Sequence, residues 1–215
     1  LRLKPDDRRC FGFFHPSMPS EPLIFVEVAL TKGIPNSIQA LLADDRDPIN
    51  AADADTAVFY SISNCQTGLA GISFGNSLIK QVAADLARDL PGLSTFVTLS
   101  PIPGLNRWLT ASDIAADNLG QDQALAAHYL LKAKKPDGTP LDPVARFHLG
   151  NGAKVHAVHA LADTSDNGLK QSNGTMVNYL YDLAQISQNH EKFVGDKAVV
   201  ASASVRSLSA SVKTK

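Results

Sequence analysis

The first residue in this chain whose setting could serve chemistry is a serine that precedes a proline-rich segment. Ser100 stands in Thr98–Gly104, TLSPIPG, at the end of a predicted strand. Because proline fixes its own φ and restricts the residue before it, Pro101 holds this serine in an extended geometry. Such a geometry suits a pre-positioned catalytic hydroxyl, and it suits a structural strand exit equally well. The pattern Gly-x-Ser-x-Gly is absent here, so the nucleophile elbow of an α/β-hydrolase is not indicated.

A histidine on a short predicted helix is the second candidate. His148 lies in the segment ARFHL, just before a glycine turn. Histidine exchanges a proton near neutral pH, but a lone histidine is more often structural than catalytic. His156 and His159 lie three residues apart on a predicted strand, which places them on opposite faces. With two dispersed cysteines, no zinc pattern emerges and we predict no metal site.

Two tyrosines could also contribute to a site. Tyr179 and Tyr181 stand two residues apart in a predicted strand and therefore share one face. A phenol on that face could donate a hydrogen bond to a substrate or a catalytic group. Both residues are equally at home as ordinary aromatic residues of a sheet.

A glycine-bearing loop opens directly into a helix near the middle of the chain. The loop, Gln66–Asn76, contains Gly68, Gly71 and Gly75. The N-terminus of a helix presents unpaired N–H groups and the positive end of the helix dipole, which suit a phosphate or pyrophosphate. The loop lacks the spacing of a dinucleotide-binding fingerprint and the Gly-Lys-Ser/Thr of a Walker A loop. It could hold a phosphorylated carrier, or it could be a structural turn.

The elements that position these residues alternate between strands and helices. Apolar runs predict strands over Leu23–Leu30, Ala57–Ser63 and Ser94–Leu99, with a short helix through Leu42 between the first two. The helix after the glycine loop ends at Pro91-Gly92. Its apolar residues fall on one face: Leu78, Ile79, Val82, Ala83, Leu86 and Leu90.

The second half of the chain continues in the same manner. Residues 105–131 have a helical pattern, and Asp142-Pro143 opens a short helix with Asp142 as the N-cap. Alternation predicts a strand over 153–163, and a polar loop, Asp163–Gly174, precedes a last strand over 175–183. The order of elements predicts a single α/β or α+β domain over residues 1–190, followed by a flexible tail over 191–215.

The composition of the chain argues against several classes of function. The 20 basic and 21 acidic residues give a net charge of −1, so no strong field recruits nucleic acid or an anionic membrane. We find no apolar run of the roughly 18 residues that span a bilayer and no signal peptide. Two cysteines make no disulfide framework, and we expect an intracellular, cytoplasmic protein. Because the chain begins with Leu1, we expect a processed product or part of something longer.

Five blocks of sequence together resemble the catalytic domain of the malonyl-CoA decarboxylase family. They occur in the family's order, from near the start to about residue 190. The blocks are HPSMPSEPLIFVEVALTKG (His15–Gly33), FYSISNCQTGLAGISFGNSLIK (Phe59–Lys80), TLSPIPG (Thr98–Gly104), ARFHLGNGA (Ala145–Ala153) and QSNGTMVNYLY (Gln171–Tyr181). Each block is weak alone, whereas five in series make a specific signal.

The resemblance implies a GNAT-like, acyl-CoA-binding fold with a mixed sheet. It implies a carboxy-lyase of fatty acid metabolism that decarboxylates malonyl-CoA to acetyl-CoA and CO2. The CoA thioester is the substrate, and no cofactor is expected. Two alternatives stay open: a GNAT-type acyltransferase that acts on an amine, and a non-catalytic acyl-CoA-binding module. The family also implies a homo-oligomer for the full-length protein and a preceding helical domain that this chain does not contain.

The resemblance assigns roles by position. The family's serine and histidine fall on Ser100 and His148 as a catalytic pair that also binds substrate, and a tyrosine near its active site falls on Tyr181. Its substrate-binding loop falls on Ala70, Gly71, Ile72, Ser73, Phe74, Gly75 and Asn76. Some relatives carry a glutamate where this chain has Ser73, so no carboxylate role carries over there. The connection between Gly104 and Pro143 is also shorter than in plant and animal relatives.

Overall fold

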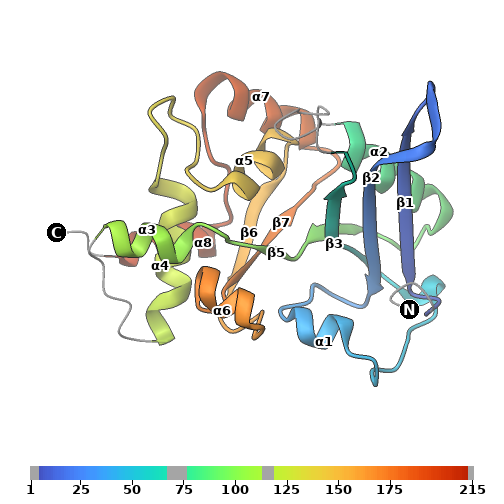
Figure 1. The fold of residues 1–215 in the computed structure, drawn as a ribbon, viewed down its shortest axis with the longest axis horizontal. Helices are drawn as coiled ribbons and strands as arrows, with labels where there is room; N and C mark the ends of the chain where they lie inside the picture. Colours follow the sequence, from blue (N-terminus) through green and yellow to red (C-terminus); the bar gives the residue numbers. More distant parts are fainter. Residues whose placement is uncertain (1–4, 67–76, 113–118, 213–215) are drawn as a thin grey trace. The chain divides into compact units, whose positions relative to one another are not determined.

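A computed structural model describes residues 5–66, 77–112 and 119–212 of the chain (Figure 1). Its contacts group into two compact units. Unit 1 comprises Leu1–Pro35 and Ala40–Thr98, and unit 2 comprises Asn36–Gln39 and Leu99–Lys215. The single domain over residues 1–190 stays a prediction, and the boundary between the two units falls after Thr98.

Unit 1 is built on a four-stranded sheet. Strands β1 (Arg8–His15), β2 (Met18–Thr31) and β3 (Thr56–Asn64) pair antiparallel, and β4 (Thr95–Thr98) runs parallel to β3. The predicted strands Leu23–Leu30 and Ala57–Ser63 lie within β2 and β3, and β4 lies within the predicted strand Ser94–Leu99. The aromatic run before Pro16, for which we predicted no strand, is β1, because each of its residues pairs with β2 in a long hairpin.

The helices of unit 1 follow the predicted pattern. Helix α2 (Ser77–Asp89) buries the predicted apolar face, of which Ile79 and Ala83 are fully buried. The short helix α1 (Ile38–Leu42) ends where expected, and a single 3-10 turn, η1 (Ala51–Asp53), precedes β3. The positions of the apolar residues therefore predict both the type of α2 and the face that it buries.

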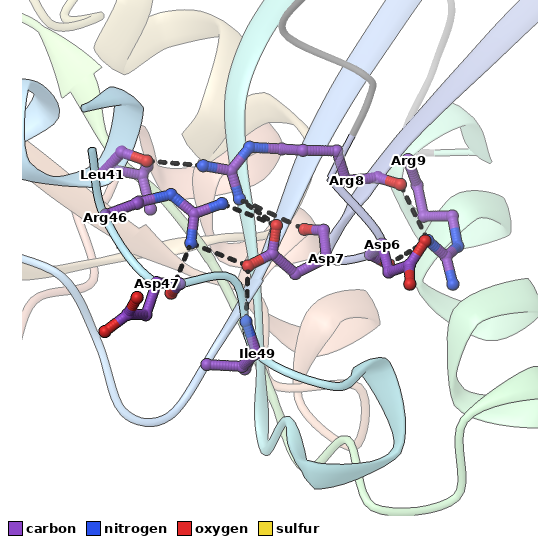
Figure 2. Close-up of polar contacts among 8 residues, drawn as sticks. All are labelled: Asp6, Asp7, Arg8, Arg9, Leu41, Arg46, Asp47 and Ile49. Carbon is purple, nitrogen blue, oxygen red and sulfur yellow. Dashed lines mark hydrogen bonds and ion pairs between the residues drawn. The ribbon is translucent and has the colours of Figure 1, made fainter. Parts of the chain in front are cut away.

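A buried ion-pair cluster fastens the start of β1 to the loop after α1 (Figure 2). The carboxylate of Asp7 accepts hydrogen bonds from Arg46 at 2.6 and 2.7 Å, from Arg8 at 3.1 Å and from the Ile49 N–H at 3.0 Å. Burial alone raises the pKa of Asp7, but the bonds from Arg46 and Ile49 and the charge of Arg8 lower it below its ordinary value. Every described partner thus favours the ionised carboxylate.

Unit 2 holds three antiparallel strands. Strand β7 (Met176–Leu180) lies between β5 (Ser100–Pro101) and β6 (Lys154–His159). Helices α3 (Leu105–Ala111) and α4 (Leu119–Lys132) fall within the predicted helical stretch, and α5 (Pro143–Gly150) begins at the predicted cap. Helices α4 and α8 (Ala203–Ser211) pack on each other and on β6 (Figure 1).

Three helices occur where the sequence predicts irregular structure. Helix α6 (Asp166–Ser172) occupies the predicted polar loop; Ser165 caps its N-terminus, and Asn173 ends it in the left-handed conformation. In the predicted tail, helix α7 (Ile186–Asp196) continues past residue 190, and α8 follows with a cap from Ser202. These helices are rich in small and polar residues, so periodicity does not reveal them. Capping and packing on the rest of unit 2 stabilise them instead.

Strands β3 and β4 pair in parallel, whereas β7 pairs antiparallel with β5 and with β6. This combination is the one predicted for a mixed sheet. Within the described ranges, no helix is long and apolar enough to cross a membrane.

Candidate active site

The two residues predicted to form a catalytic pair lie in contact within unit 2. The Oγ atom of Ser100 is 3.2 Å from Nε2 of His148, although 48 residues separate them in sequence. Ser100 is 5% exposed and His148 is 4% exposed. Ser100 opens β5, where it pairs with Val177 of β7. A serine hydroxyl and an imidazole at this distance can share a hydrogen bond and transfer a proton.

Local sequence explains why α5 presents His148 from its last turn. Asp142 caps the helix by accepting a hydrogen bond from the Ala145 N–H at 2.8 Å, and Pro143 occupies the first turn. The helix ends before Gly152, whose φ of +82° suits glycine, and a Cβ at Gly152 would overlap the Ile186 carbonyl. The cap and the glycine turn therefore set the length of α5, and that length places His148 beside β7.

The two tyrosines of the last strand region both contact His148. The Tyr181 hydroxyl is 2.7 Å from Nδ1 of His148. The Tyr179 ring stacks on the imidazole, with ring centroids 4.5 Å apart and planes inclined by 23°. Their common face is the one predicted from strand alternation. Tyr181 therefore orients the imidazole through its nitrogen, while Tyr179 supports the plane of the ring.

Burial sets the protonation states of this group. It lowers the pKa of His148 to about 3 and raises the pKa of Tyr181 well above its ordinary value. At neutral pH the imidazole is therefore neutral and the phenol is protonated. One ring nitrogen of His148 then donates a hydrogen bond while the other accepts. Ser100, His148 and Tyr181 form a hydrogen-bonded series through which a proton can pass without a stable imidazolium.

The predicted substrate-binding loop cannot be compared with this pair. Its members lie outside the described residues: Ala70, Gly71, Ile72, Ser73, Phe74, Gly75 and Asn76. Helix α2 directly follows the loop, as predicted.

The histidines of β6 require a correction. A β-bulge between Val155 and Ala157 interrupts the alternation that predicted His156 and His159 on opposite faces. Burial lowers the pKa of His156, and nearby Lys154 and His159 lower it further. Nε2 of His159 contacts the Asn178 side chain of β7. In the described part of the chain, no group of three or more His, Cys, Asp or Glu residues is placed to hold a metal ion.

A second buried group comprises Asp142, Tyr129 and Tyr179, and the sequence reveals only part of it. Asp142 is identifiable as a helix cap. Its proximity to Tyr129 and Tyr179 is not, since these residues come from separate helices and strands. The negative charge of Asp142 raises the pKa of both tyrosines, after the larger effect of burial.

Comparisons with known proteins identify the family of the chain. The family model for the malonyl-CoA decarboxylase C-terminal domain matches residues 1–124 and 113–215. The mitochondrial malonyl-CoA decarboxylase of Anser anser anser is 36% identical over 249 residues, which cover 93% of this chain and 49% of that protein. The Mus musculus enzyme is 34% identical, with 94% and 51% covered. The chain thus spans about half the length of the curated relatives it matches.

Solved structures show the same relationship. Malonyl-CoA decarboxylase from Rhodopseudomonas palustris matches with a TM-score of 0.91 and 51% identity, covering 96% of this chain and 54% of that one. The Agrobacterium vitis protein matches with a TM-score of 0.89 and 48% identity, covering 96% and 58%. The GphF GNAT-like decarboxylase, at 19% identity and a TM-score of 0.56 over 84% of this chain and 80% of that one, shows that the fold is GNAT-like. The chain belongs to the malonyl-CoA decarboxylase family.

Proposed function

We propose that this chain carries the active site of a malonyl-CoA decarboxylase, which converts malonyl-CoA to acetyl-CoA and CO2. The observation that carries the proposal is the hydrogen-bonded series of Ser100, His148 and Tyr181, in a chain of this family. The matched relatives are malonyl-CoA decarboxylases, which supports malonyl-CoA as the substrate.

The reaction sets three demands on the protein. The bond between the α-carbon and the carboxylate breaks, its electron pair moves into the thioester carbonyl, and CO2 leaves. The resulting enolate then takes a proton at the α-carbon to give acetyl-CoA. The site must therefore hold the carboxylate out of the plane of the carbonyl, stabilise the enolate oxygen and deliver one proton.

The Ser–His–Tyr series would meet the last of these demands. Ser100 would contact the malonyl carboxylate and then donate its hydroxyl proton to the α-carbon. His148 would return a proton to Ser100 from Nε2. Tyr181 would donate its hydroxyl proton to Nδ1 and would then be reprotonated. Because burial keeps His148 neutral, the enzyme would not store the proton on an imidazolium before CO2 leaves. The proton consumed in each turnover would come from solvent, and no acyl-enzyme would form.

The glycine loop would supply the remaining groups. We propose that backbone N–H groups around Ile72–Phe74 bind CoA and polarise the thioester oxygen, as the position of the loop before α2 favours. No cofactor takes part in this scheme. A homo-oligomeric full-length protein and a cytoplasmic location stay predictions, and the curated relatives are mitochondrial by name.

The test is to mix the intact protein with malonyl-CoA and to detect acetyl-CoA by mass. We expect Ser100→Ala and His148→Ala to lower kcat/KM by about 10²–10⁴-fold, as for a group that transfers a proton in the transition state. Ser209→Ala is a matched control, because Ser209 is also buried in unit 2 but lies on α8. Near wild-type turnover in either site variant would exclude its assigned role. Acetyl transfer to amines without decarboxylation would instead establish an acyltransferase.

A further inference from the structure

The proposed mechanism makes no use of Asp142, a buried carboxylate at the start of α5. Asp142 has no exposed surface, and Oδ1 makes the capping bond to the Ala145 N–H. A cap needs only one short acceptor, and elsewhere in unit 2 serine suffices: Ser165 caps α6 and Ser202 caps α8. The longer side chain of Asp142 carries a second oxygen, Oδ2, that the cap does not require.

That second oxygen faces the end of the segment that begins with Ser100. A Cβ built on Gly104 would lie 3.8 Å from Oδ2 of Asp142 and would overlap the hydroxyl of Tyr129. Gly104, Tyr129 and Asp142 therefore meet at one closely packed corner. Burial raises the pKa of Asp142 above its ordinary value, although the N–H groups of Ala145, Val144 and Gly104 and the charge of Arg146 act in the opposite direction.

The corner connects the two segments that carry the catalytic pair. Gly104 comes four residues after Ser100 and directly precedes α3, while Asp142 comes six residues before His148 and directly precedes α5. The Tyr179 ring, which stacks on His148, lies close enough to Asp142 for the carboxylate to raise its pKa. Asp142 thus caps the helix behind His148, and its Oδ2, which has no hydrogen-bond partner among the described residues, lies beside Gly104 at the end of the segment behind Ser100.

We propose that Asp142 is a positioning residue, which joins the N-terminus of α5 to Gly104 and thereby sets the distance between Ser100 and His148. The inference rests on the proposed function. The cap alone does not require an aspartate at this position, because the capping bond uses only Oδ1. A displacement of about 1 Å between reacting groups can lower a rate by about 100-fold.

The decisive variant is Asp142→Ser, measured in the intact protein beside Asp142→Ala. Serine keeps an acceptor for the cap but cannot reach Gly104 and Tyr129. We expect Asp142→Ser to regain much of the melting temperature that Asp142→Ala loses. Its kcat for malonyl-CoA should nevertheless stay about 10–100-fold below wild type, with KM within about twofold. Ser165→Ala, which removes a cap from α6, should lower the melting temperature without changing kcat.

A purely structural role gives a different result. If Asp142→Ser regains kcat together with the melting temperature, Asp142 is only a cap and the proposal is wrong. A second pair of variants tests the corner from its other side. Gly104→Ala should lower kcat. Adding Tyr129→Phe removes the overlapping hydroxyl, and the double variant should have a kcat at least threefold above that of Gly104→Ala. A Gly104→Ala variant with wild-type kcat would also overturn the proposal.

The two proposals fail in distinguishable ways. If the wild-type protein forms no acetyl-CoA from malonyl-CoA, the proposed function fails regardless of Asp142. The ¹⁵N NMR signals of the His148 ring then still report its hydrogen bonds. Asp142→Ser should shift these signals and Ser165→Ala should not; unchanged signals in Asp142→Ser would reject the positioning role.

Discussion

The hydroxyl of Tyr181 lies 2.7 Å from Nδ1 of His148, and this bond determines what the opposite nitrogen can offer to Ser100. When the phenol donates, Nε2 carries the ring proton and donates to the serine. When Nδ1 donates to the phenol oxygen, Nε2 accepts from the serine instead. The tyrosine therefore couples the tautomer of a buried, neutral imidazole to the direction in which Ser100 can move a proton.

We expect Tyr181→Phe to lower kcat for malonyl-CoA about tenfold while KM changes little. The variant keeps the ring but leaves Nδ1 of a buried imidazole without its hydroxyl partner, which costs about 1–3 kcal/mol. Steady-state kinetics with malonyl-CoA measures the effect. Tyr60→Phe, which removes a hydroxyl in unit 1, serves as the control and should retain wild-type kcat. Unchanged kcat in Tyr181→Phe would remove the tyrosine from the mechanism.

Folding stability should fall as the pH drops below about 6.5. The unfolded chain protonates His148 near its ordinary pKa of 6.5, whereas the folded chain binds that proton only near pH 3. Between these values the unfolded state holds more protons, so lower pH favours unfolding. At pH 5 the difference amounts to about 2 kcal/mol. Denaturant unfolding of the wild type and of His148→Gln at pH 8 and pH 5 measures it.

The glutamine variant is the reference for that experiment, because it cannot take up the proton. We expect the wild type to lose about 2 kcal/mol more than His148→Gln between the two pH values. Equal losses would mean that His148 is accessible to protons in the folded state. Correspondingly, kcat of the wild type should show no decline centred near pH 6.5.

Leu161→Gly should stabilise the protein. Leu161 adopts a φ of +51°, in the left-handed region that costs a residue with a Cβ about 1–2 kcal/mol, and its side chain is 48% exposed. The strain relieved should exceed the flexibility that glycine adds to the unfolded chain, with a net gain of about 0.5 kcal/mol. Thermal unfolding provides the measurement. Asn173→Gly, at a φ of +52°, is the control and should gain less, since asparagine tolerates this conformation.

Arg46→Ala should destabilise unit 1 by about 3 kcal/mol, because it leaves the buried Asp7 carboxylate without its two shortest hydrogen bonds (Figure 2). The matched control is Arg88→Ala. Arg88 pairs with Asp85 at 2.9 Å on the surface, where its side chain is 69% exposed. That variant should unfold at the wild-type denaturant concentration. Similar losses of unfolding free energy in the two variants would show that burial of the Asp7 cluster adds nothing to stability.

The local sequence predicts those parts of the fold that depend on interactions between neighbouring residues. The Asp142-Pro143 cap predicts the start of α5, and the spacing of apolar residues predicts α2 and its buried face. Motifs spread along the chain also predict the family, which the comparisons confirm. The small and polar sequences of α6 and α8 carry no such periodic signal, and the bulge at His156 depends on the partner strand.

The protonation state of His148 is a property of the folded chain and not of its local sequence. The sequence determined that a serine, a histidine and a tyrosine of suitable chemistry are present, on elements of known type. Their meeting depends on contacts across 48 and 33 residues, and the neutrality of the imidazole depends on its burial beside Tyr179. Desolvation is a property of everything that surrounds a group in space, and therefore no local pattern could have predicted it.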